Sequence, residues 1–173
     1  MVGEVVLRGN LLTRTLVALS DAGVRFVVCG GVACVLQGVA RATHDLDVRV
    51  RLTDDDLRAL IVACRAVGLT PRIPEPIEAV LDPARRHAWI VEKRAVVYTL
   101  LAPDGSFSLD VFLRYPLTFE ELDAVADVVV IEGRSVKVSS KAHLIVAKRA
   151  VDPPRTRDLR DIADLEELLR GDR

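Results

Sequence analysis

The chain has 173 residues, half of them apolar, and a mean hydropathy of +0.27, which is enough for one globular domain and short for two. Its 24 Lys and Arg nearly balance 25 Asp and Glu, so the net charge of -1 neither requires nor excludes a nucleic-acid partner. The apolar stretch 26–40 is too short and too interrupted by glycine to span a bilayer, and the start, MVGEVVLRGN, lacks the pattern of a signal peptide. We therefore expect a cytoplasmic protein with no membrane partner.

Three cysteines, Cys29, Cys34 and Cys64, lie among apolar residues and show no Cys-x-x-Cys spacing. An odd number of cysteines in such surroundings is typical of buried, reduced thiols. We expect neither a disulfide nor a zinc site.

The first 69 residues alternate between helical and extended patterns. Apolar residues spaced three and four apart predict helices, whereas short apolar runs beside glycine predict buried strands. The segment is predicted to contain a helix over 11–24, a strand over 25–30, a short helix over 32–38, a strand over 45–50 and a helix over 53–69. Gly30 and Gly31 separate the first strand from the short helix.

The rest of the chain continues the mixture of helices and strands. Residues 70–82 contain three prolines and no regular pattern, so we expect an irregular segment there. The elements predicted after it are a helix over 82–93, strands over 95–101 and 106–113, a short helix over 118–126, strands over 127–133 and 134–140, and two helices separated by the break at 151–156. This order predicts one α/β (α+β) domain, a mixed twisted sheet flanked by helices. We expect its core over 10–115 and a C-terminal helical part over 139–170.

Two aspartates, Asp45 and Asp47, interrupt the otherwise apolar strand DLDV. Because a strand alternates its faces, both side chains project the same way, with Cβ atoms about 6–7 Å apart. At about 5 Å and an effective dielectric constant near 20, two carboxylates repel by on the order of 3 kcal/mol. Mg²⁺, which prefers oxygen ligands, would neutralise them, although on an exposed edge strand water would serve as well. Asp110, flanked by Leu109 and Val111 in a later strand, is a third acid for the same sheet face.

The glycine pair supplies the second half of this candidate site. Backbone N–H groups at Gly30 and Gly31 can approach phosphate oxygens because no Cβ stands in the way. Three carboxylates beside such a turn predict a site for two divalent ions that hold a triphosphate and an attacking hydroxyl. The predicted chemistry is phosphoryl or nucleotidyl transfer.

The segment GGVACVLQGVARATHDLDV resembles the signature of the nucleotidyltransferase superfamily related to DNA polymerase beta. In that signature a strand and a Gly-Gly or Gly-Ser pair precede two acids spaced two apart, and a third acid lies in a later strand. The sequence is most similar to abortive-infection-type toxin nucleotidyltransferases and uncharacterised bacterial relatives, whose C-terminal helices the tail 139–169 also resembles. The resemblance implies a nucleotidyltransferase fold and Mg²⁺-dependent transfer of a nucleoside monophosphate from an NTP to a hydroxyl, with two Mg²⁺ ions and Mn²⁺ as a substitute.

The resemblance also implies roles for individual residues. Gly30 and Gly31 would contact the phosphates, and Asp45 and Asp47 would bind both metal ions. Three further positions match: Asp110, the acid that activates the hydroxyl; Lys148, a lysine that approaches the phosphates; and Asp158, an acid whose role is catalytic or structural.

Several other polar and aromatic residues have two readings. Arg41 and Thr43 lie in the loop before the acids, where an arginine reaches either a triphosphate or a surface ion pair. The excess of basic residues between 141 and 160 would receive an RNA or a triphosphate, or form a solvated helix face, and it lacks aromatic residues for base stacking. Trp89 and Tyr98 are expected in the core and not in a nucleobase platform.

Two positions depart from the family pattern. Gln37-Gly38 stands where relatives usually have His-Gly, and Gly31 stands where many have Ser. Neither change affects the carboxylates. The acceptor stays open between tRNA, as for a toxin with an antitoxin partner, a small molecule such as an antibiotic, and a protein. A non-catalytic module that binds a nucleotide or a partner through the same fold is the alternative of a different class.

Overall fold

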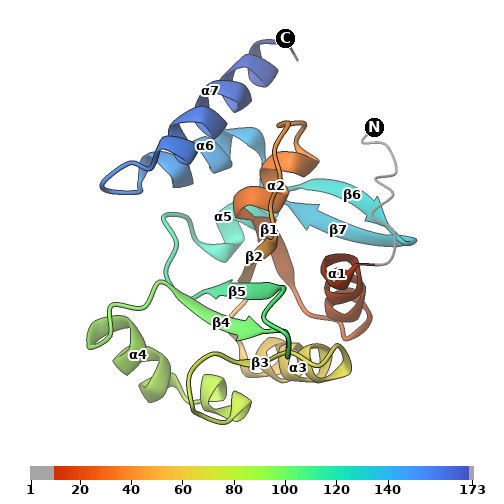
Figure 1. Ribbon diagram of the computed structural model, residues 1–173, viewed down its shortest axis with the longest axis vertical. Helices are drawn as coiled ribbons and strands as arrows, with labels where there is room; N and C mark the ends of the chain where they lie inside the picture. Colours follow the sequence, from red (N-terminus) through yellow and green to blue (C-terminus); the bar gives the residue numbers. More distant parts are fainter. Residues whose placement is uncertain (1–9, 172–173) are drawn as a thin grey trace.

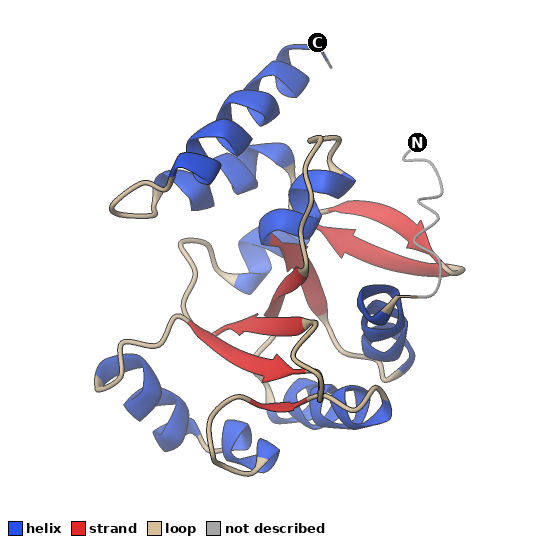
Figure 2. Cartoon of the chain, viewed as in Figure 1, coloured by secondary structure: helices blue, strands red, loops and turns tan. Residues whose placement is uncertain are grey.

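The computed structural model describes residues 10–171, so the first nine residues, part of the stretch that lacks a signal-peptide pattern, lie outside it. One mixed sheet carries helices on its faces (Figures 1 and 2). The helices are α1 (Leu11–Asp21), α2 (Gly30–Leu36), α3 (Asp54–Ala66), the 3-10 helix η1 (Ile77–Leu81), α4 (Pro83–Val91), α5 (Phe119–Ala124), α6 (Lys141–Arg149) and α7 (Thr156–Gly171). The strands are β1 (Phe26–Cys29), β2 (Asp45–Val50), β3 (Thr70–Pro71), β4 (Val97–Leu101), β5 (Ser108–Phe112), β6 (Asp127–Ile131) and β7 (Arg134–Val138).

The seven strands lie in the order β3-β4-β5-β2-β1-β7-β6. Two of the pairings, β2 with β5 and β1 with β7, are parallel, and the other pairs are antiparallel. Strands β2 and β5, which carry the predicted acids, are therefore direct neighbours in the middle of the sheet.

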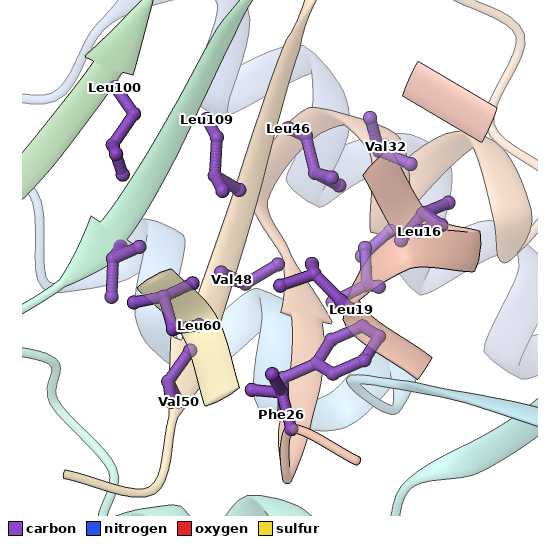
Figure 3. Close-up of a cluster of buried hydrophobic side chains, with 14 of the residues drawn as sticks. Leu16, Leu19, Phe26, Val32, Leu46, Val48, Val50, Leu60, Leu100 and Leu109 are labelled. Carbon is purple, nitrogen blue, oxygen red and sulfur yellow. The ribbon is translucent and has the colours of Figure 1, made fainter. Parts of the chain in front are cut away.

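One face of the sheet carries the main hydrophobic core. Leu46 and Val48 of β2 are fully buried and point toward the same side as Leu109 of β5, where Leu16 of α1 and Leu60 of α3 close over them (Figure 3). Because side chains alternate along a strand, Asp45, Asp47 and Asp110 project from the opposite face. Burial of the apolar residues thus fixes the face on which the acids stand.

The opposite face is covered only in part. Phe119 and Leu122 of α5 pack against Val27 and Cys29 of β1 in a second, smaller apolar cluster. The α6–α7 helical hairpin stands beside α2, at the top of Figure 1, and α6 contacts α2. Between the segment that precedes α5, this hairpin and the strands the face stays open as a cleft, which is described below.

The fold class and the order of the elements are confirmed, with two local differences. Helix α2 begins at Gly30, two residues earlier than predicted, so the glycine pair forms its first turn. The prediction of an irregular segment over 70–82 is wrong in part: Thr70 and Pro71 pair with β4 as an edge strand, and η1 follows. Both elements are too short to produce a periodic sequence pattern.

The structure also bears on the cysteines and on membrane-spanning helices. All three cysteines are free and buried, and burial raises the pKa of each thiol. Among residues 10–171, no helix combines the length and the apolar character needed to cross a membrane.

Candidate active site

The register of the two central strands brings the predicted acids together. In the parallel pair β2·β5, Asp47 lies directly opposite Asp110, and Asp45 lies opposite Ser108. Neighbouring strands are about 4.8 Å apart, so the backbones that carry Asp47 and Asp110 are as close as a sheet allows. The sequence predicted that the three acids share a face, and the structure brings them together there.

The environment of these carboxylates disfavours their charged forms. Burial raises the pKa of Asp47 to about 6, and the negative charges of Asp110 and Asp45 raise it further. A hydrogen bond from the Gly31 backbone lowers it in part. Burial also raises the pKa of Asp110. The hydroxyl of Thr99 donates to Asp110 Oδ1 over 2.5 Å and lowers that pKa in part. Ser108 Oγ donates to Asp45 Oδ1 over 3.0 Å. The site thus holds negative charge that a nearby cation would stabilise.

The glycine turn is in contact with the carboxylates. Gly30 has a φ of +60°, and a Cβ at this position would lie 2.0 Å from Asp47 Oδ2. A Cβ on Gly31 would lie 2.7 Å from Thr43 Oγ1 and 3.2 Å from Arg41 Nη2. Gly30 therefore excludes a side chain, whereas a side chain at position 31 would require the Thr43 hydroxyl and the end of Arg41 to shift.

These groups line one cleft of about 910 Å³. Its floor is formed by the three aspartates, and one wall by the glycine pair with Arg41, Thr43 and Lys148. The other lining residues come from β4 and the residue before it, from the end of β5 and the segment after it, from the α6–α7 loop and from the start of α7, and include Val96, Val97, Phe112, Arg114, Tyr115, Val151, Asp152, Arg155, Arg157 and Asp158. The structure thus brings every candidate site residue of the sequence to one cleft.

Lys148 is buried and forms ion pairs within the C-terminal hairpin. Its Nζ donates to Asp158 Oδ1 over 3.2 Å and to Asp161 Oδ2 over 2.6 Å. Burial is the largest single influence and disfavours the ammonium ion, but the hydrogen bonds and charges of Asp161 and Asp158, with other raising contributions, together outweigh it, so the pKa of Lys148 is raised. Arg41 Nη1 pairs with the same Asp161 oxygen over 2.5 Å, and Arg155 Nε pairs with Asp158 over 2.5 Å. Arg41 therefore forms an ion pair and also lines the cleft, and its contact with a triphosphate stays a prediction.

Three polar residues near the acids were not singled out from the sequence. Arg49 shares the face of Asp45 and Asp47 and donates to the backbone carbonyl of Phe112 over 2.7 Å. Arg49 follows Asp47 by two residues in the same strand, and this spacing could have placed its side chain on the face of the acids. Asp161 follows Asp158 by three residues on one helix face, which was a second usable signal. Thr99 could not be found, because only the β4·β5 register places it opposite Asp110.

Three further predicted positions have structural roles. Gln37 Nε2 donates to Asp127 Oδ2 over 2.7 Å and to the Ser139 carbonyl over 2.9 Å, so the departure from His-Gly joins α2 to the end of the sheet. Trp89 and Tyr98 are buried and stacked with ring centroids 5.2 Å apart. The prediction that they belong to the core is confirmed.

The donor set suits Mg²⁺, which binds carboxylate oxygens and keeps several ligands from water and substrate phosphates. Within residues 10–171, no three His, Cys, Asp or Glu side chains are gathered closely enough to form a metal centre by themselves. Ser108 and Thr99 hold Asp45 and Asp110 by separate hydrogen bonds. Asp45, Asp47 and Asp110 would hold such a metal, which would supply Lewis-acid chemistry to a bound phosphate.

No protein-family model matches the sequence, and no curated protein matches it significantly. Among solved structures, the lincomycin-bound lincosamide antibiotic adenylyltransferase LnuA superposes with a TM-score of 0.61 at 15% identity, over 96% of this chain and 99% of that one. The antibiotic-resistance factor ANT(2'')-Ia superposes with a TM-score of 0.52 at 17% identity, over 93% of this chain and 88% of that one. The chain has the nucleotidyltransferase fold. At these identities the likeness concerns the fold alone, and the fold that the sequence predicted is confirmed.

Proposed function

We propose that this chain is a Mg²⁺-dependent nucleotidyltransferase, which transfers a nucleoside monophosphate from an NTP to a hydroxyl and releases pyrophosphate. The observation that supports this most is the register of β2 and β5, which puts Asp47 directly opposite Asp110 beside the Gly30 turn. Fold alone does not determine activity, but these acids stand in the cleft that the fold leaves open.

The cleft suggests a division of roles. The backbone at Gly30 and Gly31, with Arg41, Thr43 and Lys148, would hold the triphosphate on one wall. Asp45 and Asp47 would bind metal ions on the floor, and Asp110 would accept the proton of the attacking hydroxyl. Asp158, which bonds to Lys148, would keep that ammonium ion charged and in place. When bound, two Mg²⁺ ions would supply Lewis-acid polarisation of the α-phosphate and a lower pKa for the hydroxyl.

We propose a small hydroxyl compound as the acceptor. This is supported by the superposition with LnuA, an adenylyltransferase solved with lincomycin bound, because each chain covers nearly all of the other. The cleft has room and apolar lining residues for such a molecule: Val96, with 50% of its surface exposed, Val97 and Phe112.

A tRNA acceptor, as for a toxin with an antitoxin partner, is the second candidate. It is favoured by Arg114, Arg155 and Arg157, which line the cleft and expose guanidinium groups suited to phosphate. Neither Arg114 nor Arg157 has an ion-pair partner among residues 10–171.

The test is incubation of the protein with each of the four NTPs labelled at the α-phosphate, Mg²⁺, and either total tRNA or a panel of lincosamides and aminoglycosides. Label on a drug supports the small-molecule acceptor, and label on RNA supports the second candidate. EDTA and Asp110→Asn should each abolish the transfer. Nucleotide binding without transfer to any acceptor, protein included, would favour the non-catalytic module.

A further inference from the structure

Five charged residues form one alternating chain, and all of them except Asp161 line the cleft. In order they are Arg41, Asp161, Lys148, Asp158 and Arg155, and each is joined to the next by an ion pair. The pairs connect three separate segments: the loop before β2, helix α6 and the start of α7. Three cations face only two carboxylates, so the cluster carries one positive charge in excess.

Asp161 is the member that joins the core of the protein to the hairpin. It is 4% exposed, and its Oδ2 accepts from both Lys148 Nζ and Arg41 Nη1. Asp161 does not line the cleft itself, whereas both of its partners do. A carboxylate behind two cleft-facing cations can act on a ligand only through them.

The geometry of Arg41 shows where its remaining donors face. Its Nη1 is bonded to Asp161 and its Nε lies 3.4 Å from the Ala42 carbonyl. Its Nη2 lies against the glycine turn, 3.2 Å from where a Cβ of Gly31 would stand, and has no hydrogen-bond acceptor among residues 10–171. Lys148 Nζ has three protons and two carboxylate partners. Each cation thus keeps donor capacity on the side of the cleft.

We propose that Asp161 is a positioning residue, which holds the Arg41 guanidinium over the Gly30–Gly31 turn and the Lys148 ammonium beside it so that both meet the phosphates of the substrate. This inference rests on the proposed function for the identity of the anion. It makes the α6–α7 hairpin one wall of the phosphate site. The excess positive charge of the cluster is then balanced by the phosphate chain of the nucleotide.

The proposal can be separated from a simple counter-ion role by the sign of one effect. If Asp161 only neutralises charge, Asp161→Asn adds one positive charge to the cleft and tightens the binding of a polyanion. If Asp161 positions Arg41, the freed guanidinium recovers its rotamer freedom and binding weakens. We expect the dissociation constant of Mg²⁺-tripolyphosphate, measured by calorimetry at fixed salt, to rise about tenfold, equivalent to about 1.4 kcal/mol.

The matched control is Glu166→Gln. It removes the ion pair between Glu166 of α7 and Arg149 of α6, which joins the same two helices outside the cleft. Its affinity for tripolyphosphate should equal that of the wild type. Arg41→Gln should weaken binding as Asp161→Asn does, and the double variant should lose less than the product of the two single losses. Should Asp161→Asn fail to fold, Arg41→Gln alone decides, because unchanged affinity in that variant overturns the proposal.

Two further outcomes distinguish failure of the positioning role from failure of the proposed function. Equal or tighter binding by folded Asp161→Asn, with wild-type transfer intact, overturns the positioning role and leaves the proposed function standing. Absence of tripolyphosphate and NTP binding by the wild-type protein overturns both.

Discussion

Replacement of Gly30 by alanine tests the contact between the glycine turn and the acids. A residue with a Cβ at a φ of +60° costs about 1–2 kcal/mol in backbone strain. The added Cβ would also lie 2.0 Å from Asp47 Oδ2, so that oxygen must retreat by about 1 Å to reach a normal contact. A displacement of about 1 Å at a reacting group costs on the order of 100-fold in rate. We expect Gly30→Ala to fold and to lose nucleotidyl transfer by about that factor.

The matched control for this variant is Gly68→Ala. Gly68 has a φ of +76° and no atom within 4 Å of an added Cβ, so it carries the backbone strain without the collision. Both variants should lower the melting temperature by a few degrees, roughly 2–8 °C for 1–2 kcal/mol. Only Gly30→Ala should lose Mg²⁺-dependent transfer from α-labelled NTP. If the transfer rate of Gly30→Ala lies within threefold of that of Gly68→Ala, the absence of a side chain at position 30 does not determine the position of Asp47.

Three further outcomes follow from the electrostatics of the floor. In the metal-free protein, the pKa of Asp47 is raised to about 6. As the pH falls, the folded state therefore binds a proton at Asp47 before the unfolded state does. The melting temperature should rise between pH 7 and pH 5. Asp47→Asn should flatten that dependence, and a wild-type stability that falls over this range would contradict it. Asp110→Asn should abolish transfer. The melting temperature of the metal-free variant should equal or exceed that of the wild type, because one of the mutually repelling charges is removed. Full activity would exclude Asp110 as the proton acceptor. Thr99→Val removes the hydroxyl that lowers the pKa of Asp110, so the acidic limb of the pH–rate profile should move to higher pH, and an unmoved limb would count against that role.

Much of the fold was predictable because its elements follow periodic patterns. The three-and-four spacing of α1 and α3 and the apolar alternation in β2 and β5 fix which face each element buries. From alternation alone, Asp45 and Asp47 had to share the face opposite Leu46. Strand β3 was not predictable, because a two-residue strand at a proline has no period and exists only through its pairing with β4.

The candidate site was predictable where local geometry determines it and not where long-range packing does. The positions of Gly30, Gly31, Asp45 and Asp47 relative to one another followed from their spacing within one strand–helix–strand unit. Nothing in the sequence joins Arg41 to Asp161, which are 120 residues apart and meet because α7 packs against α6, which contacts α2. The close approach of Thr43 and Arg41 to Gly31 likewise depends on tertiary contact.

The most direct test of the metal-dependent mechanism is the location of Mn²⁺ by anomalous diffraction, in crystals grown with α,β-methylene-ATP or another non-hydrolysable NTP. We expect Mn²⁺ bound between Asp45, Asp47 and Asp110, with the phosphates over the Gly30–Gly31 turn. Ordered nucleotide without Mn²⁺ at these carboxylates, or Mn²⁺ bound elsewhere with Asp110 unengaged, would contradict the account.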